Sequence, residues 1–223
     1  MTHADDGRPP GLTWRFDRAE LIADGVVHVV GVVAAVFAAG ALVGIALDRA
    51  ELATVSSLAV YAASLMAVLG LSAVYNMWPV SRTKWLLRRF DHAAIWLLIA
   101  GTYTPFMVHV GTPAAQIVLA AVWLAALAGA ALKLIAPGRF DRLAVFGYLA
   151  IAWSGLFIAG EVFAALSTLS IVLLALGGVL YTAGVVFHLW ERLRFQNAIW
   201  HGFVLVAAGC QYGAVLEGVL LGA

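Results

Sequence analysis

Residues 21–46 read LIADGVVHVVGVVAAVFAAGALVGIA, and Asp24 is the only side chain in this run that carries a formal charge. A helix needs about 20 mostly apolar residues to cross the hydrocarbon core of a bilayer, so this run is long enough to span one. Six more apolar runs follow, separated by polar or Pro/Gly-containing breaks. The seven predicted spans are residues 21–46, 53–77, 92–110, 114–135, 143–163, 168–190 and 198–221. The sequence therefore predicts an all-α protein, an integral membrane bundle of seven transmembrane helices.

The composition of the chain is that of a membrane protein. Of its 223 residues, 64% are hydrophobic and 11% are charged, and the mean hydropathy is +0.98. These values exclude a water-soluble globular domain. The net charge of +1 leaves no basic surface for a nucleic acid. Residues 1–19 are expected to form a short cytoplasmic N-terminal tail, and residues 20–223 the seven-helix domain.

The basic residues predict how the bundle is oriented, because cytoplasmic loops retain Lys and Arg. Of the thirteen Lys and Arg residues, only Arg49 falls on the side opposite the others. We therefore expect a multi-pass protein of the plasma (inner) membrane, with its N-terminus in the cytoplasm and its C-terminus outside.

Polar side chains at membrane depth are the candidates for a functional site, because each is costly in lipid. They fall on five of the predicted helices, and all of them lie in the cytoplasmic half. Asp91 and His92 are expected to open the third helix. Since helix direction alternates along the chain, these side chains should meet at one level and form a single polar pocket. The candidate residues are Glu20, Asp24, His28, Ser72, Asn76, Asp91, His92, His188, Asn197 and His201.

Simpler roles are open for several of these residues. A carboxylate at the start of a helix, such as Glu20 or Asp91, is often a cap. His28, His188, Ser72 and Asn76 could each hydrogen-bond a neighbouring helix. Independent roles of this kind do not explain why five helices contribute polar groups at one depth.

Four segments resemble the hemolysin III family and its relatives, the progestin and adipoQ receptors. They are ELIADGVVH (residues 20–28), SAVYN (residues 72–76), FDHAAIWLLIAGTYTPF (residues 90–106) and NAIWHGFVLVAAG (residues 197–209). The family has a seven-helix membrane fold with its N-terminus inside the cell. The resemblance therefore implies the same architecture as the apolar runs and the charges.

The resemblance also implies a zinc ion near the cytoplasmic face, bound by three histidines, with a serine and an aspartate beside the catalytic water. Relatives resemble lipid amide hydrolases of the ceramidase type. Carried over by position, Ser72 and Asp91 take the catalytic roles and His201 is one metal ligand. The other two ligand positions hold Asn76 and Asn197. A carboxamide is a weak zinc ligand, so a site of three histidines cannot form at these positions.

Three outcomes are open for the metal site. In the first, His28, His92 or His188 joins His201 and Asp91, and a zinc-dependent lipid amide or ester hydrolase results. In the second, a different cation binds and the chemistry changes. In the third, no metal binds, and the polar residues form a hydrogen-bonded network in a lipid-sensing or structural protein.

A pore-forming hemolysin is a further class, suggested by the family name, although no helix carries the row of charges that a conducting pore requires. The expected partners are membrane lipids and not nucleic acids. The sequence predicts no protein partner and no oligomeric state.

Overall fold

The computed structural model describes Trp14, residues 16–138 and residues 140–221. Most of the predicted tail, residues 1–13 and 15, lies outside the described residues. The secondary structure in the described part is helical. In chain order the elements are α1 (Arg18–Arg49), α2 (Leu52–Met77), α3 (Arg82–Val110), α4 (Pro113–Ile135), α5 (Asp141–Ala152), η1 (Ser154–Ile158), α6 (Ala159–Ala165), α7 (Thr168–Leu189), α8 (Gln196–Val215) and η2 (Leu216–Leu221).

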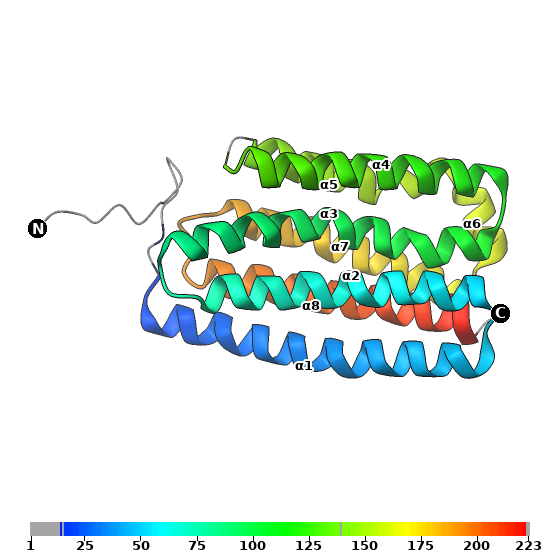
Figure 1. Ribbon diagram of the computed structural model, residues 1–223, viewed down its shortest axis with the longest axis horizontal. Helices are drawn as coiled ribbons and strands as arrows, with labels where there is room; N and C mark the ends of the chain where they lie inside the picture. Colours follow the sequence, from blue (N-terminus) through cyan, green and yellow to red (C-terminus); the bar gives the residue numbers. More distant parts are fainter. Residues whose placement is uncertain (1–13, 15, 139, 222–223) are drawn as a thin grey trace, which may run out of the picture.

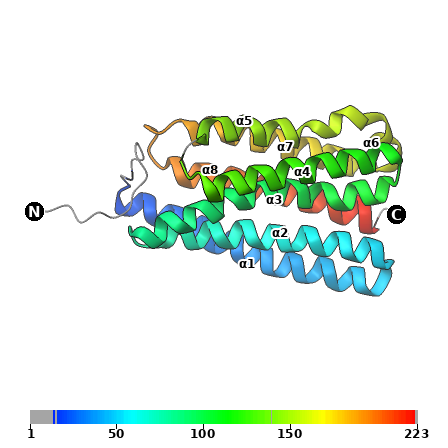
Figure 2. The same cartoon turned by 45° about the horizontal axis from the view of Figure 1, so that its top comes forward.

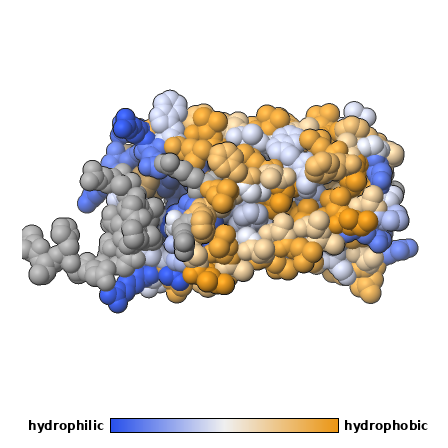
Figure 3. Space-filling view, turned by 90° about the horizontal axis from the view of Figure 1, so that it is seen from above, coloured by the Kyte–Doolittle hydropathy of each residue, from blue (hydrophilic) through white to orange (hydrophobic). Residues whose placement is uncertain are grey.

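Seven helical segments of the described chain are long and apolar enough to cross a membrane, with α5, η1 and α6 together forming the fifth and α8 with η2 the seventh. Large apolar side chains such as Phe37 (74% exposed), Leu124 (71%) and Phe157 (89%) point away from the bundle. Figure 3 shows apolar side chains over the middle of one face and hydrophilic ones toward its two ends. The predicted all-α bundle with seven spans is confirmed.

The spans run side by side in alternating directions, so that α1 begins at one end of the bundle and η2 ends at the other (Figures 1 and 2). Helix α3 packs along both α2 and α4, and α8 packs along both α1 and α7. The end at which α1 begins is called the N-terminal end below. Because directions alternate, α2, α4 and α7 finish there, and α3, α5 and α8 start there.

The third span begins ten residues earlier than predicted. Helix α3 starts at Arg82 rather than at residue 92, and the side chain of Ser81 caps it by accepting a hydrogen bond from the Lys84 amide at 3.3 Å. The prediction that Asp91 and His92 open this helix is wrong, since both lie in its third turn. A run of apolar residues identifies only the part of a helix that lies in lipid. The first turns of α3 contain too many polar residues to be recognised as part of such a run.

The fifth span is not the continuous helix that the sequence predicts for residues 143–163. Helix α5 ends at Ala152, and a 3₁₀ turn leads into α6. The hydroxyl of Tyr103 enters this break: it donates to the Ala152 carbonyl at 2.8 Å and accepts from the Gly155 amide at 2.7 Å. The phenol thus pairs backbone groups that the break leaves without helical partners.

The α3–α4–α5 contact is built around Trp96. Its indole ring lies between two glycines, Gly129 on α4 and Gly147 on α5. A Cβ atom at Gly129 would lie 2.3 Å from the ring, and one at Gly147 would lie 2.6 Å from it. Only glycine permits this approach, which lets the backbones of α4 and α5 lie close to the Trp96 ring of α3.

Candidate functional site

A cavity of about 480 Å³ lies within the bundle. Most of its charged and histidine lining lies in the N-terminal half of the bundle, and the sequence-predicted part of that lining comes from five helices. The sequence-predicted residues that line it are His28, Ser72, Asn76, Asp91, His92, His188, Asn197 and His201. Much of the remaining wall is apolar, with Leu98, Phe106, Phe163 and Leu174 among its residues. The structure thus brings eight of the ten predicted residues to one cavity, and Glu20 and Asp24 do not line it.

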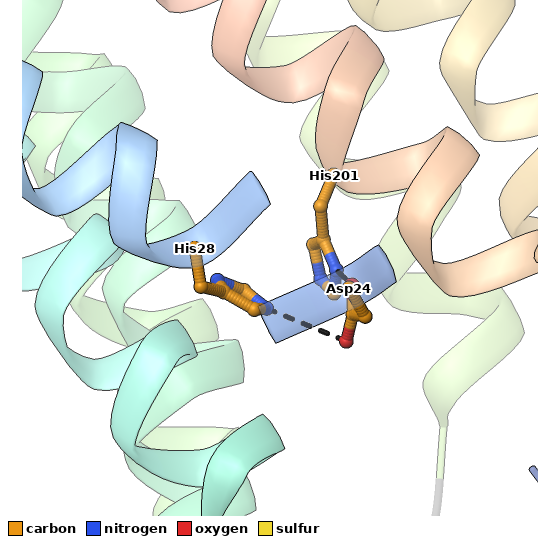
Figure 4. A group of neighbouring side chains, drawn as sticks. All are labelled: Asp24, His28 and His201. Atoms are coloured by element: carbon orange, nitrogen blue, oxygen red, sulfur yellow. Dashed lines mark hydrogen bonds and ion pairs between the residues drawn. The ribbon is translucent and has the colours of Figure 1, made fainter. Parts of the chain in front are cut away.

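Asp24, His28 and His201 form a compact cluster between α1 and α8 (Figure 4). Asp24 and His28 lie one turn apart on α1, and both are 5% exposed. His201 reaches Asp24 from α8, with its Nδ1 2.6 Å from Asp24 Oδ1. The rings of His28 and His201 lie next to each other, with centroids 4.3 Å apart. One potential ligand atom from each residue falls within 4.8 Å of the other two.

The cluster fits a metal ion by its chemistry. Two imidazoles and a carboxylate are a common zinc ligand set that leaves one position open. His28 Nε2 is buried and lacks a hydrogen-bond partner among the described residues, and it lies 3.6 Å from Asp24 Oδ2. Ligand atoms around a tetrahedral zinc lie about 3.3 Å apart, so three side chains whose ligand atoms fall within 4.8 Å of one another could share an ion after small side-chain rotations. An ion there would give the buried nitrogen a partner.

A second hollow, of about 420 Å³, lies at the N-terminal end beside this cluster. Asp24 lines this hollow, whereas His28 and His201 line the main cavity, and Asn76 lines both. The cluster therefore sits in the wall between the two spaces.

The two asparagines at the family's ligand positions both line the main cavity. The Asn76 amide donates to the Ser72 carbonyl at 3.0 Å and to the Ser72 hydroxyl at 3.3 Å. Its nitrogen is therefore occupied within α2, and only its oxygen remains for another group. Of the three histidines considered as replacements, His28 lies beside His201, and the carboxylate next to them is Asp24 rather than Asp91.

Asp91 is buried on α3, at 7% exposure, and faces the same cavity. It lies within hydrogen-bonding reach of Ser72 and interacts electrostatically with Arg88 and His201. Since Asp91 lies well inside α3, it is not the helix cap that its sequence position permitted.

Glu20 has a local role. It forms a capping box with Asp17, whose carboxylate accepts from the Glu20 amide at 2.9 Å while Glu20 Oε2 accepts from the Asp17 amide at 2.8 Å. Its other oxygen accepts from the Phe195 amide at 3.0 Å. The Glu20 amide holds the pKa of Asp17 below its ordinary value, despite the opposing effect of desolvation. Glu20 thus ties the start of α1 to the start of α8.

His92 and His188 line the cavity outside the metal-type cluster. The His92 carbonyl accepts a hydrogen bond from the Tyr148 hydroxyl at 2.9 Å. The His188 ring lies against Trp200, with centroids 4.9 Å apart, and its Nδ1 is buried without a hydrogen-bond partner among the described residues.

Three charged residues of the cavity wall were not predicted as site residues. Arg88 and Lys133 both bind Asp141, at 2.7 Å and 2.6 Å. Burial opposes ionisation of Asp141, but the hydrogen bonds from Lys133 and Arg88 prevail and hold its pKa well below the ordinary value. Arg88 lies one turn before Asp91 and His92, and this helical spacing was the signal available in the sequence.

The comparisons with known proteins agree with this architecture. Residues 18–212 match the family model described as "Haemolysin-III related". The chain is similar to the "Hemolysin-3 homolog" of Bacillus subtilis, with 34% identity over 203 residues that cover 90% of this chain and 95% of the relative. It is 32% identical to "Hemolysin-3" of Bacillus cereus, over 90% of this chain and 92% of the relative.

A more distant similarity is to the "Monocyte to macrophage differentiation factor" of Homo sapiens, at 28% identity over 70% of this chain and 67% of the relative. Residues 18–212, which match the family model, contain the whole lining of the cavity. The chain belongs to the haemolysin-III related family and is a multi-pass integral membrane protein.

Proposed function

We propose that this protein is a metal-dependent hydrolase that cleaves an amide or ester bond in a membrane lipid. The observation that supports this proposal is the composition of the cavity wall. Histidine, aspartate and serine side chains gather toward one end, and much of the remaining wall is apolar. A lipid can place its chain against the apolar wall and its polar bond beside the titratable groups.

The metal would be held by Asp24, His28 and His201, since Asn76 and Asn197 replace two histidines of the family pattern. A zinc ion bound there would supply Lewis-acid chemistry, polarising a carbonyl oxygen and lowering the pKa of a nearby water.

The remaining groups have roles that follow from their places in the wall. Asp91 is buried beside Ser72 and would accept the proton of the attacking water and then return it to the leaving amine or alcohol as the carbonyl bond breaks. The Ser72 hydroxyl would donate to the oxyanion that develops on the carbonyl. The apolar wall would exclude bulk water from the reacting bond.

The orientation of the bundle is part of this proposal. We place the N-terminal end, with the cluster and the second hollow, on the cytoplasmic side of the plasma membrane, because nine of the ten Lys and Arg residues in the described part of the chain belong to segments at that end. Single cysteines at Ser81 and at Glu51, in a Cys210→Ser background, test it with a membrane-impermeant thiol reagent on intact cells. Labelling at Glu51 and not at Ser81 is expected, and the reverse would overturn the orientation.

A non-catalytic lipid-binding protein is the second candidate. The hydrogen bonds from Asn76 to Ser72 favour it, because they form a polar network that needs no metal. A pore is less well supported, since the titratable lining is concentrated in one half of the bundle.

Metal analysis of the purified full-length protein separates the two candidates. We expect near-stoichiometric zinc in the wild type and its loss in His28→Ala. His92→Ala is the matched control, because His92 lines the same cavity outside the cluster, and it should keep its metal. Release of fatty acid from a lipid amide should then be lost in Asp91→Asn. A wild type that binds no metal and still binds lipid would overturn the hydrolase and leave the lipid-binding role.

A further inference from the structure

Arg88, Lys133 and Asp141 form a second charged group on the cavity wall. They belong to three different helices, with Arg88 on α3, Lys133 in the last turn of α4 and Asp141 at the first residue of α5, just before the fifth span begins at Leu143. Arg88 Nη2 donates to Asp141 Oδ2 at 2.7 Å, and Lys133 Nζ donates to Asp141 Oδ1 at 2.6 Å. All three residues line the main cavity.

The charges within this group do not balance. Two cations share one carboxylate, and each oxygen of Asp141 already accepts one hydrogen bond. Arg88 is 9% exposed and Lys133 is 4% exposed, so both positive charges are largely removed from water. A buried charge is costly unless it is paired. The group therefore holds one positive charge more than the carboxylate to which it is hydrogen-bonded, and an anion in the cavity would share that charge with Asp91, which interacts with Arg88.

The cations also keep hydrogen-bond donors to spare. A guanidinium has five N–H donors and an ammonium has three, and Asp141 takes one from each. Arg88 also contacts the hydroxyl of Tyr75, which leaves further donors on both residues. Arginine and lysine together are well suited to a carboxylate or phosphate, whose oxygens accept several charge-assisted hydrogen bonds.

The apolar lining of the cavity indicates that the anion belongs to a molecule with a hydrocarbon chain. Apolar side chains such as Leu98 and Phe106 line the same space and would cover a hydrocarbon chain. Asp91 lies one turn beyond Arg88 and interacts with both Arg88 and His201, so the charged group adjoins the proposed reaction site.

We propose that Arg88 and Lys133, held in place by Asp141, form a recognition site for the anionic head of a lipid whose chain occupies the cavity. The ligand class is a lipid with a carboxylate or phosphate oxyanion. The proposal rests on the proposed hydrolase only in making this lipid a substrate, because binding itself requires no catalysis.

The test measures binding of two probes to the full-length protein in nanodiscs of neutral phospholipid. One probe is a long-chain alkyl phosphate, and the other is the alcohol of the same chain length. Loss of one charge-assisted hydrogen bond is worth roughly 10- to 100-fold in affinity. We expect the phosphate to bind the wild type at least about tenfold more tightly, and Arg88→Gln and Lys133→Gln each to remove most of that preference.

Three controls make the result specific. Lys133→Arg keeps the charge and should keep the preference for phosphate. Arg194→Gln removes an exposed cation that pairs with Asp17, outside the cavity lining, and should also keep it. Inorganic phosphate should compete only weakly, because it has no chain to bury. A salt bridge that merely joins α3, α4 and α5 would alter stability in these variants without changing the ratio of the two affinities.

Two results would overturn the proposal. One is equal affinity of the wild type for both probes, which needs no variant to be folded. The other is competition by inorganic phosphate as strong as that by the alkyl phosphate, which would show a site for free anion. His28→Ala should lose the metal and keep the preference for phosphate. Failure of the hydrolase proposal is thus distinguishable from failure of the recognition site.

Discussion

Replacement of Gly129 by alanine should destabilise the bundle through its contact with Trp96. The added Cβ would lie 2.3, 2.4 and 2.7 Å from three atoms of the indole ring, whereas ordinary contacts of a Cβ atom lie at 3.4–4 Å. The ring would have to retreat by about 1 Å. It cannot do so freely, because Gly147 on α5 already lies close to the same indole. The space between them is so small that a Cβ at Gly147 would lie 2.6 Å from the ring.

The size of the effect follows from these contacts. Overpacking a rigid core costs about 1–3 kcal/mol, and a ring confined between two helices belongs at the upper end of that range. Alanine has a higher helix propensity than glycine, which offsets at most about 1 kcal/mol. The net loss should be about 2 kcal/mol, which changes the unfolding equilibrium constant by roughly 30-fold.

The assay is reversible unfolding in mixed micelles, followed by tryptophan fluorescence in one detergent. Gly40→Ala is the matched control, because an added Cβ there meets nothing within 4 Å, and it should be at least as stable as the wild type. In a Trp96→Leu background, Gly129→Ala should cost much less, since the ring is gone. Equal stability of Gly129→Ala and Gly40→Ala would refute the argument.

Two further predictions concern charged residues. The Lys84 ammonium is fully buried and donates to the carbonyls of Tyr75, Asn76 and Trp78, at 2.7, 3.1 and 3.0 Å. Lys84→Met should therefore lower the unfolding free energy by about 3 kcal/mol in the same assay. A loss below about 1 kcal/mol, which is typical of an exposed ion pair, would contradict this role. The depressed pKa of Asp141 means that its ion pairs contribute fully above the ordinary value of 3.8 and are lost as the pH falls below it toward the folded-state pKa. The unfolding temperature of the wild type should thus fall more steeply below pH 4 than that of Asp141→Asn, and parallel curves would show that this carboxylate contributes no acid sensitivity.

The apolar runs were sufficient to predict the number of spans, because burial in lipid requires long apolar helices whatever their tertiary contacts. They did not predict the first turns of α3, where Ser81 caps a polar segment. They also missed the break between α5 and α6, because the hydroxyl that pairs its backbone comes from Tyr103, some 50 residues earlier in the chain.

The sequence by itself determined the seven-span architecture and the gathering of polar groups toward one end, since alternating helix direction brings these positions to one level. Spacing cannot tell which of these groups touch. The tertiary structure decided that Asp24, rather than Asp91, lies beside His28 and His201, that Glu20 caps a helix, and that Arg88 and Lys133 face the cavity. The physical reason is that spacing along a helix sets only the relative directions of its own side chains. Contacts between helices depend on how each helix is rotated about its axis and on the distance between helices. Packing between helices, such as that of Trp96 against Gly129, determines both.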